Sequence, residues 1–360
     1  MPQAHSPDDM HFMTQAIRLA AFGLGQTAPN PSVGCVIVNG GQVVGTGTTS
    51  KGGRPHAEVN ALKEAGKQAK GATAYVSLEP CSHTGKSPPC TDALIKAGIS
   101  KVVYASHDPN PLVNGQGRAK LEAAGVSVIS GLMSSEADEM NSGFFLSITE
   151  KRPRYTVKIA SSLDGKIATS TGESKWITGP EARRYGHSLR ANNDAILVGI
   201  DTVQADDPML DCRIAGLESD SPARIILDTQ ARIKNDCQLI QTAENIPTYL
   251  ITEQENISFP NVTVIQVDNI RDVQSLSRTF TELGFTRVLI EGGPTVQASF
   301  ICAGLCDELY WFRAPIMIGQ EGKSAIGNLA LDILSQAQSY ELREMQTLGA
   351  DLLERRSRKR

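Results

Sequence analysis

Three residues with metal-binding side chains stand at spacings that favour a zinc site. His56 opens the run His56-Ala57-Glu58, and a proline precedes each of the cysteines Cys81 and Cys90. One histidine and two thiolates leave the fourth tetrahedral position of Zn²⁺ open for water, as a catalytic zinc requires. Glu58 is not needed as a ligand, so it can move protons beside the metal. The pattern predicts attack of zinc-bound hydroxide on a ring carbon that bears an amine.

The order of these residues matches H-x-E followed by P-C-x-x-C, the signature of zinc-dependent nucleobase deaminases, with one departure. The second cysteine stands nine positions after the first instead of three. A structural site closed by His83 as fourth ligand, or no metal at all, stays open as an alternative. Asn30, in Asn30-Pro31-Ser32-Val33-Gly34, can read a heterocycle edge with its amide, although an asparagine before proline is also a common turn residue.

The elements expected around this motif alternate between strands and helices. Helices are predicted at 8–24, 56–65, 90–97 and 116–124, and strands at 33–38, 43–47, 73–78, 101–105 and 126–129. This alternation predicts an α/β sheet covered by helices. Both parts of the zinc motif fall where strands end or helices begin, so we expect them to meet at one edge of the sheet.

A helix at 135–148 leads into Lys151-Arg152-Pro153, which predicts a boundary near residue 150 and two domains, 1–150 and 151–360. In the second domain we expect a loop at 211–222 and helices at 180–191, 271–283 and 294–303. Strands are predicted at 155–160, 194–198, 223–228, 247–251, 262–267, 287–291, 307–314 and 350–356.

A glycine pair in the second domain favours phosphate binding. Glu291-Gly292-Gly293-Pro294-Thr295 follows an apolar strand and opens a helix. Glycines let a phosphate approach the backbone, the helix N-terminus favours its charge, and proline suits the first turn. By itself the pair is more often a plain turn. Neither half contains a G-x-G-x-x-G of the Rossmann type between a strand and a helix.

The composition limits the partners and the cellular compartment that we expect for the chain. The chain has 360 residues and a net charge of −4, which gives no general attraction to nucleic acid. Its one basic run, 355–360, is expected to be a solvated tail. The N-terminus lacks an apolar signal segment and no apolar run is long enough to span a membrane. We expect a cytoplasmic protein whose cysteines outside the zinc pattern are ordinary buried or half-buried thiols: Cys212, Cys237, Cys302 and Cys306.

The motifs of both halves resemble the bifunctional deaminase-reductase family of riboflavin biosynthesis. In the first half these are Asn30-Pro31, Val33-Gly34, His56-Ala57-Glu58 and the insert from Pro80 to Cys90, which ends in Pro-Pro-Cys. In the second half they are Val157–Ala168, Trp176-Ile177-Thr178, Asp194–Gly199, Asp206-Asp207-Pro208 and Glu291–Pro294.

The resemblance implies a cytidine-deaminase-like three-layer α/β/α domain followed by a dihydrofolate-reductase-like α/β domain. The first would deaminate 2,5-diamino-6-(ribosylamino)pyrimidin-4-one 5′-phosphate, and the second would reduce the ribosyl group to ribityl with NADPH. Each chain would hold one Zn²⁺ on His56, Cys81 and Cys90, and we expect a homo-oligomer. A deaminase of another base would leave the second domain unexplained. A zinc-stapled protein whose basic tail binds RNA is the non-enzymatic alternative.

The resemblance also implies binding residues. In the deaminase the substrate would meet Asn30, His83, Lys86, Asp108 and Asn110, although an ordinary loop role stays open for the last four. NADPH would lie near Ala160, Trp176, Thr202, Asp206, Thr229, Gly293, Pro294, Thr295, Val296, Gln297, Ala298 and Ser299. The reductase substrate would lie near Ser174, Arg190, Leu210, Arg213 and Glu291. Arg190 and Arg213 suit its phosphate because guanidinium offers paired donors, and Lys158 could polarise the reacting imine.

Overall fold

The structure, a computed structural model, describes residues 7–83, 87–110 and 115–359. The chain forms two compact units, Met1–Arg152 and Pro153–Arg360. Each is a mixed α/β unit with its own sheet. No helix among the described residues is both long and apolar enough to cross a membrane.

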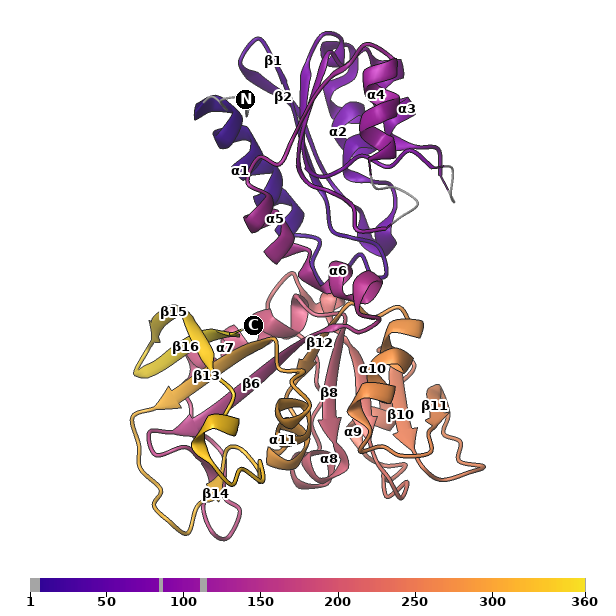
Figure 1. Cartoon of the computed structure of the whole chain (residues 1–360). Coiled ribbons are helices and arrows are strands. Elements are labelled where there is room, and N and C mark those ends of the chain that lie inside the picture. The colour runs from indigo at the N-terminus through magenta and orange to yellow at the C-terminus, as the bar shows by residue number, and fades with distance from the viewer. Residues whose placement is uncertain (1–6, 84–86, 111–114, 360) are drawn as a thin grey trace. The chain divides into compact units, whose positions relative to one another are not determined.

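The first unit is a five-stranded sheet between two layers of helices (Figure 1). The strand order is β2-β1-β3-β4-β5, in which β1 runs antiparallel to both its neighbours and β3, β4 and β5 are parallel. The strands are β1 Gly34–Asn39, β2 Gln42–Thr48, β3 Thr73–Leu78, β4 Lys101–Ser106 and β5 Ser127–Ser130. Helices α1 Pro7–Ala21 and α5 Ser134–Met140 cover one face, and α2 Ala57–Ala65, α3 Cys90–Ala97 and α4 Gln116–Ala123 cover the other.

Glycines in the strands let helices approach the sheet closely. A Cβ on Gly34 would lie 2.0 Å from the carbonyl oxygen of Ala16 in α1, and a Cβ on Gly47 would lie 2.2 Å from that of Ala57 in α2. Such separations are far inside van der Waals contact, so only glycine fits. The second contact sets the first turn of α2 directly on β2, and this turn carries the residues of the H-x-E motif.

The second unit is built on a nine-stranded sheet of order β11-β10-β9-β8-β12-β6-β13-β16-β15. The first seven of these are parallel, whereas β16 is antiparallel to β13 and to β15. The strands are β6 Arg154–Ser162, β8 Ala195–Gly199, β9 Ala223–Leu227, β10 Thr248–Thr252, β11 Val262–Gln266, β12 Arg287–Ile290, β13 Glu308–Ala314, β15 Tyr340–Leu348 and β16 Asp351–Arg358. A separate small pair joins β7 Lys166–Ala168 and β14 Lys323–Ser324.

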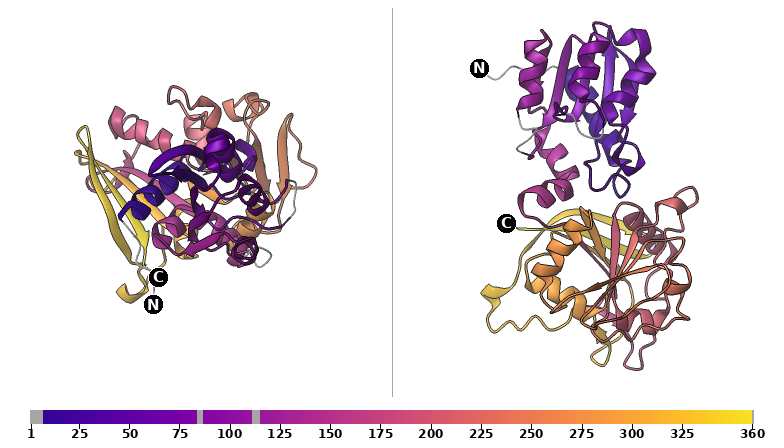
Figure 2. Two further views of the ribbon diagram at one scale, coloured as in Figure 1. Left: turned by 90° about the horizontal axis from the view of Figure 1, so that it is seen from above. Right: turned by 90° about the vertical axis from the view of Figure 1, so that its right-hand side faces the viewer.

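Helices pack on both faces of this second sheet (Figure 2). Residues of α10 Val273–Glu282 and α11 Pro294–Cys302 fill one core, which includes Phe280 and Phe300. Residues of α7 Pro180–Ala191, α8 Ile200–Asp206 and α9 Gln238–Gln241 fill the other. The parallel strands therefore end together at one edge, as ligand-binding α/β sheets require.

Several sequence expectations about elements are wrong. The helix expected at 135–148 is two helices, α5 and α6 Ser142–Thr149, separated at Asn141. The Asn141 amide exchanges hydrogen bonds of 3.1 and 2.8 Å with the backbone N–H and carbonyl of Ser32, and this side-chain pairing marks the break. No prediction was made for α8, α9, β7, β14 or β15.

The basic run near the C-terminus is not a solvated tail. Arg355 and Arg356 lie on β16, where Arg355 pairs with Glu308 of the neighbouring strand and Arg356 pairs with Glu354. A strand position beside buried carboxylates satisfies these guanidinium groups, which a count of like charges in sequence does not reveal. The expectation for the cysteines also fails at one position, because Cys302 is exposed.

Candidate functional site

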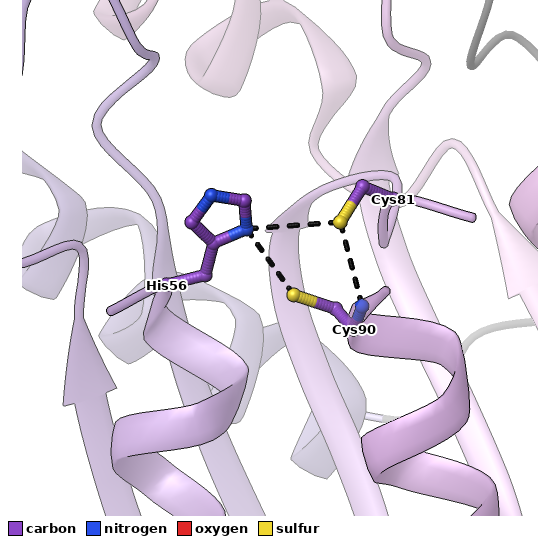
Figure 3. Close-up of side chains that lie close together, drawn as sticks. All are labelled: His56, Cys81 and Cys90. Carbon is purple, nitrogen blue, oxygen red and sulfur yellow. Dashed lines mark hydrogen bonds between the residues drawn. The ribbon is translucent and has the colours of Figure 1, made fainter. Parts of the chain in front are cut away.

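His56, Cys81 and Cys90 come together at one edge of the first sheet (Figure 3). His56 is the N-cap residue of α2, Cys81 follows β3, and Cys90 begins α3. His56 Nδ1 lies 3.2 Å from Cys90 Sγ and 3.7 Å from Cys81 Sγ. Tetrahedral zinc with bonds of about 2.1 Å to nitrogen and 2.3 Å to sulfur separates these atoms by about 3.6 Å. The three side chains therefore fit a zinc ion.

The surroundings of Cys81 favour its thiolate form. The Cys90 thiol donates to Cys81, and this hydrogen bond is the largest cause that lowers the Cys81 pKa to about 4. His56 and the backbone N–H of Cys90 contribute further. The same pairing and burial raise the pKa of Cys90. A deprotonated sulfur is the form that binds metal.

Glu58 lies on the first turn of α2 and is only 3% exposed. Burial is the largest cause that raises its pKa to about 7, and the negative charge on Cys81 adds to this effect. The carboxyl group is therefore held against the metal-binding cluster without belonging to it. This is the arrangement that proton transfer beside a metal requires.

The other deaminase candidates lie in different settings. Asp108 is 7% exposed and burial raises its pKa to about 6, while the backbone N–H of Asn110 donates to it at 2.8 Å. Asn30 is half-buried, and its amide packs against Gly53. His83 is exposed and is not part of the metal-binding group among the described residues, which disfavours the closed four-ligand site. Lys86 lies outside the described residues.

A cleft of about 270 Å³ lies beside β6 and α7 in the second unit. Lys158 and Ala160 reach it from β6, and Glu291 reaches it from the end of β12. Of the residues predicted for the cofactor and the substrate, the cleft brings together Ala160, Ser174, Trp176, Arg190, Asp206, Arg213 and Glu291.

The centre of this cleft is a buried ion cluster. Arg190 Nε and Nη2 lie 2.9 and 3.1 Å from the two carboxylate oxygens of Glu291, and Lys158 Nζ lies 3.7 Å from one of them. Burial opposes ionisation of Glu291, but the charges of Arg190 and Lys158 outweigh it and lower the Glu291 pKa to about 2. Arg190 Nη1 also donates to the carbonyl of Asp211 at 2.9 Å.

The glycine pair lies between β12 and α11, as the sequence predicts. Gly293 is the N-cap residue of α11 and Pro294 occupies its first turn. A Cβ on Gly293 would lie 3.7 Å from Thr202 Oγ1, so this α8 residue borders the glycine turn. The Gln297 amide is 6% exposed and donates to the carbonyl of Gly292 at 2.8 Å. This open, glycine-lined helix start can take a phosphate.

Two predicted residues lie apart from both the cleft lining and the glycine turn with its helix α11. Leu210 is 3% exposed and packs in a hydrophobic core, and Thr229 is exposed beyond the end of β9. Arg183 and His187 also line the cleft from α7, together with Arg190, although neither was predicted as a site residue. Their spacing of three to four residues places them on one helix face, and this signal could have found them.

Comparisons with known proteins match both units. Residues 153–353 match the family model described as RibD C-terminal domain, and residues 6–106 match the cytidine and deoxycytidylate deaminase zinc-binding region. The riboflavin biosynthesis protein RibD of Aquifex aeolicus (strain VF5) is 43% identical over 96% of this chain and 97% of its own length. The Escherichia coli (strain K12) protein of the same name is 39% identical over 96% of this chain and 98% of its own.

Solved structures agree over the full length. RibD of Acinetobacter baumannii, form 1, has a TM-score of 0.89 at 38% identity and covers 98% of this chain and 99% of its own. A diaminohydroxyphosphoribosylaminopyrimidine deaminase/5-amino-6-(5-phosphoribosylamino)uracil reductase from Thermotoga maritima has a TM-score of 0.89 at 35% identity, with the same coverage.

Proposed function

The chain belongs to the RibD family of bifunctional riboflavin-biosynthesis enzymes, and we propose below how its residues carry out the two reactions. The predicted family, fold class and function are confirmed. The first unit is the cytidine-deaminase-like domain and the second is the dihydrofolate-reductase-like domain. The enzyme deaminates 2,5-diamino-6-(ribosylamino)pyrimidin-4-one 5′-phosphate and then reduces its ribosyl group to ribityl.

For deamination, the observation that carries the proposal is the group of three ligand atoms within 4.8 Å of one another, with buried Glu58 beside it. His56, Cys81 and Cys90 would hold one Zn²⁺, which would supply a polarised water when bound. Glu58 takes a first proton from the water and passes it to a ring nitrogen of the pyrimidine. It then takes the second proton from the added hydroxyl and gives it to the amino group, which leaves as ammonia. His56 and the two cysteines hold the metal and transfer no proton.

The substrate groups of the deaminase are assigned by position. We propose that the Asn30 amide reads the ring edge and that Asp108 and Asn110 contact the ribosyl phosphate part. The half-buried Asn30 supports this, because its backbone carbonyl accepts from the Thr27 hydroxyl and its backbone N–H donates to the Thr27 carbonyl. The linked pair Asp108–Asn110 supports it too, because the Asn110 N–H donates to the Asp108 carboxylate. His83 contacts the outer, polar part of the substrate, and Lys86 is proposed with it on sequence alone.

For reduction, we propose NADPH as the hydride source, which fits the nicotinamide-dependent chemistry of a reductase domain. Gly293 to Ser299, from the N-cap of α11 onward, and Thr202 beside the glycine would hold a cofactor phosphate. Ala160, Trp176 and Asp206 line the cleft beside the nicotinamide. We assign the 2′-phosphate to Thr229, an exposed residue beyond β9.

Each residue of the ion cluster has a different role toward the substrate. Lys158 polarises the reacting imine. The Glu291 carboxylate lies 3.7 Å from Lys158 Nζ and orients this ammonium group toward the cleft. Arg190 already gives its Nε, Nη1 and Nη2 donors to Glu291 and Asp211, so its main role is to hold Glu291. Arg213, whose side chain is 64% exposed, lies 3.4 Å from Asp211 through its Nε, and we assign the substrate phosphate to this exposed guanidinium. Ser174 completes the substrate side of the cleft, whereas the Leu210 side chain is packed in the hydrophobic core and is not assigned a substrate contact.

The test is a coupled assay on the zinc-loaded chain. The diaminopyrimidine ribosyl phosphate is supplied and ammonia is measured, and NADPH is then added and its oxidation followed. We expect ammonia first and NADPH consumption only after deamination. Glu58→Gln should retain zinc, release no ammonia and still consume NADPH when given the deaminated intermediate. Ammonia release by Glu58→Gln at the wild-type rate would refute the proton-transfer role.

We propose that the enzyme is a cytoplasmic homo-oligomer. Reducing conditions suit its cysteines, all seven of which are free thiols. The edge strand β15 presents Leu342 and Met345 to solvent, with exposed fractions of 50% and 62%, among charged residues such as Glu341 and Arg343, and an edge strand can pair with a second copy of the chain. Light scattering should report a dimer or a larger assembly, and Leu342→Lys should shift it toward monomer. A monomeric wild-type chain would contradict this.

A further inference from the structure

Glu79 is a buried carboxylate that the deamination mechanism does not use. It follows β3 and stands two residues before the ligand Cys81. Its side chain is fully buried, although acidic side chains are almost never found inside a protein without partners. Its backbone N–H donates to the carbonyl of Ser106 at 2.9 Å, which places it beside the end of β4.

The partners of this carboxylate lie at the start of α4. The backbone N–H of Gly115 donates to Oε2 at 3.2 Å, and that of Arg118 donates to Oε1 at 3.4 Å. A carboxylate in this place satisfies helix N–H groups that otherwise have no partner and complements the helix dipole. The contact is close, because a Cβ on Gly117 would lie 2.2 Å from the carbonyl oxygen of Pro80.

The third partner of the Glu79 carboxylate is His107, the residue directly before Asp108. His107 Nδ1 lies 3.5 Å from Glu79 Oε2. Glu79 is thus attached to the chain just before Asp108 and again at Gly115, after Asn110. Burial is the main cause that raises the Asp108 pKa, and the negative charges of Glu79 and Cys81 raise it further, in keeping with their closeness.

We propose that Glu79 is a positioning residue of the deaminase, which fixes Asp108 and Asn110 relative to the zinc ligand Cys81. The reason is connectivity: one buried side chain contacts His107, the residue before Asp108, and the start of α4, and it belongs to the same turn as the ligand Cys81. Loss of the Glu79 charge leaves the zinc ligands in place. Asp108 and Asn110, which are proposed to contact the ribosyl phosphate, are then no longer fixed. This inference rests on the proposed contacts of Asp108 and Asn110 with the substrate.

The experiment measures kcat and KM for ammonia release in the zinc-loaded full chain. Glu79→Gln keeps the shape but replaces one acceptor with an amide that cannot accept from both N–H groups. We expect KM for the diaminopyrimidine ribosyl phosphate to rise about tenfold or more, with kcat within about threefold of wild type and the same zinc content. Gly117→Ala disturbs the same contact from the helix side and should raise KM in the same way. Tyr75→Phe is the control.

The control removes a hydrogen bond of 2.7 Å between Tyr75 and Asp9 on the opposite face of the same sheet. It should lower the melting temperature without raising KM. An unchanged KM in both Glu79→Gln and Gly117→Ala would overturn the proposal, as would a loss of zinc that parallels the loss of activity. Failure of the proposed function is distinct from either, because the wild-type chain would then release no ammonia. Should Glu79→Gln not fold, Gly117→Ala decides the question.

Discussion

Replacement of Glu291 by glutamine tests the ion cluster of the reductase directly. The carboxylate accepts two hydrogen bonds from Arg190 and lies 3.7 Å from Lys158 Nζ, with its side chain only 10% exposed. Glutamine has nearly the same shape but no charge, and its amide N–H₂ would face a guanidinium donor. Both cations would then stay in the cleft without their counter-ion, which is the costly way to break a buried pair.

The expected loss of folding stability follows from the Glu291 pKa. The value falls from 4.5 to about 2, and each tenfold change in the dissociation constant corresponds to about 1.4 kcal/mol. The ionised carboxylate therefore stabilises the reductase unit by about 3 kcal/mol at neutral pH. For a unit of this size, Glu291→Gln should lower the melting temperature of that unit by roughly 6–12 °C. NADPH oxidation should fall as well, while ammonia release stays unchanged.

The pH dependence has a definite sign. A carboxyl whose folded pKa is lowered stabilises the fold fully above its unfolded pKa of about 4.5, and loses that contribution as pH falls toward 2. The stability gap between wild type and Glu291→Gln should therefore be largest at pH 7 and shrink to about 2 kcal/mol at pH 3.5.

A matched surface variant provides the control. Asp201→Asn removes the partner of Arg232 in an exposed pair of the same unit, where the aspartate side chain is 86% exposed. It should cost about 0.5 kcal/mol or less. A gap for Glu291→Gln that is no larger than the Asp201→Asn gap, or one that is the same at pH 7 and pH 3.5, would refute the reasoning.

Three further predictions concern both units. Lys158→Met should lower NADPH oxidation by about a hundredfold without affecting ammonia release, and an intact reductase rate would remove Lys158 from the mechanism. A chelator should abolish ammonia release but not NADPH oxidation with the deaminated intermediate, and added Zn²⁺ should restore it; retained ammonia release by a zinc-free chain would contradict this. Gly34→Ala should destabilise the first unit by about 1–3 kcal/mol, since its Cβ would lie 2.0 Å from the Ala16 carbonyl oxygen, and an unchanged thermal transition would argue against this packing.

Features with short-range causes could be predicted from the sequence. The helix expected at 180–191 has those bounds in α7, where Pro180 stands in the first turn. The helix expected from 294 begins at Pro294 in α11, directly after the glycine pair. The expected junctions for His56 and Cys90 hold as well, because strand ends, capping positions and prolines mark them within a few residues.

Features that depend on a distant partner could not be predicted. The helix break at Asn141 depends on hydrogen bonds to Ser32, which is 109 residues away in the chain. The strand β16 continues to Arg358, two residues beyond the expected strand at 350–356, and its Arg355 pairs with Glu308 of the neighbouring strand. In both cases the partner residue lies far away in the chain, outside any local sequence window.

The two arginines predicted for the substrate phosphate show that distant partners also decide the roles of residues in the reductase cleft. Arg190 and Arg213 are equally apt by residue type, yet Arg190 has given Nε and Nη2 to Glu291 and Nη1 to Asp211, whereas the Arg213 side chain is 64% exposed. A guanidinium has five N–H donors, and its role depends on how many are already used. Only the fold, which brings residue 291 to residue 190, shows that one arginine is bound to the buried Glu291 carboxylate while the other lies exposed beside Asp211.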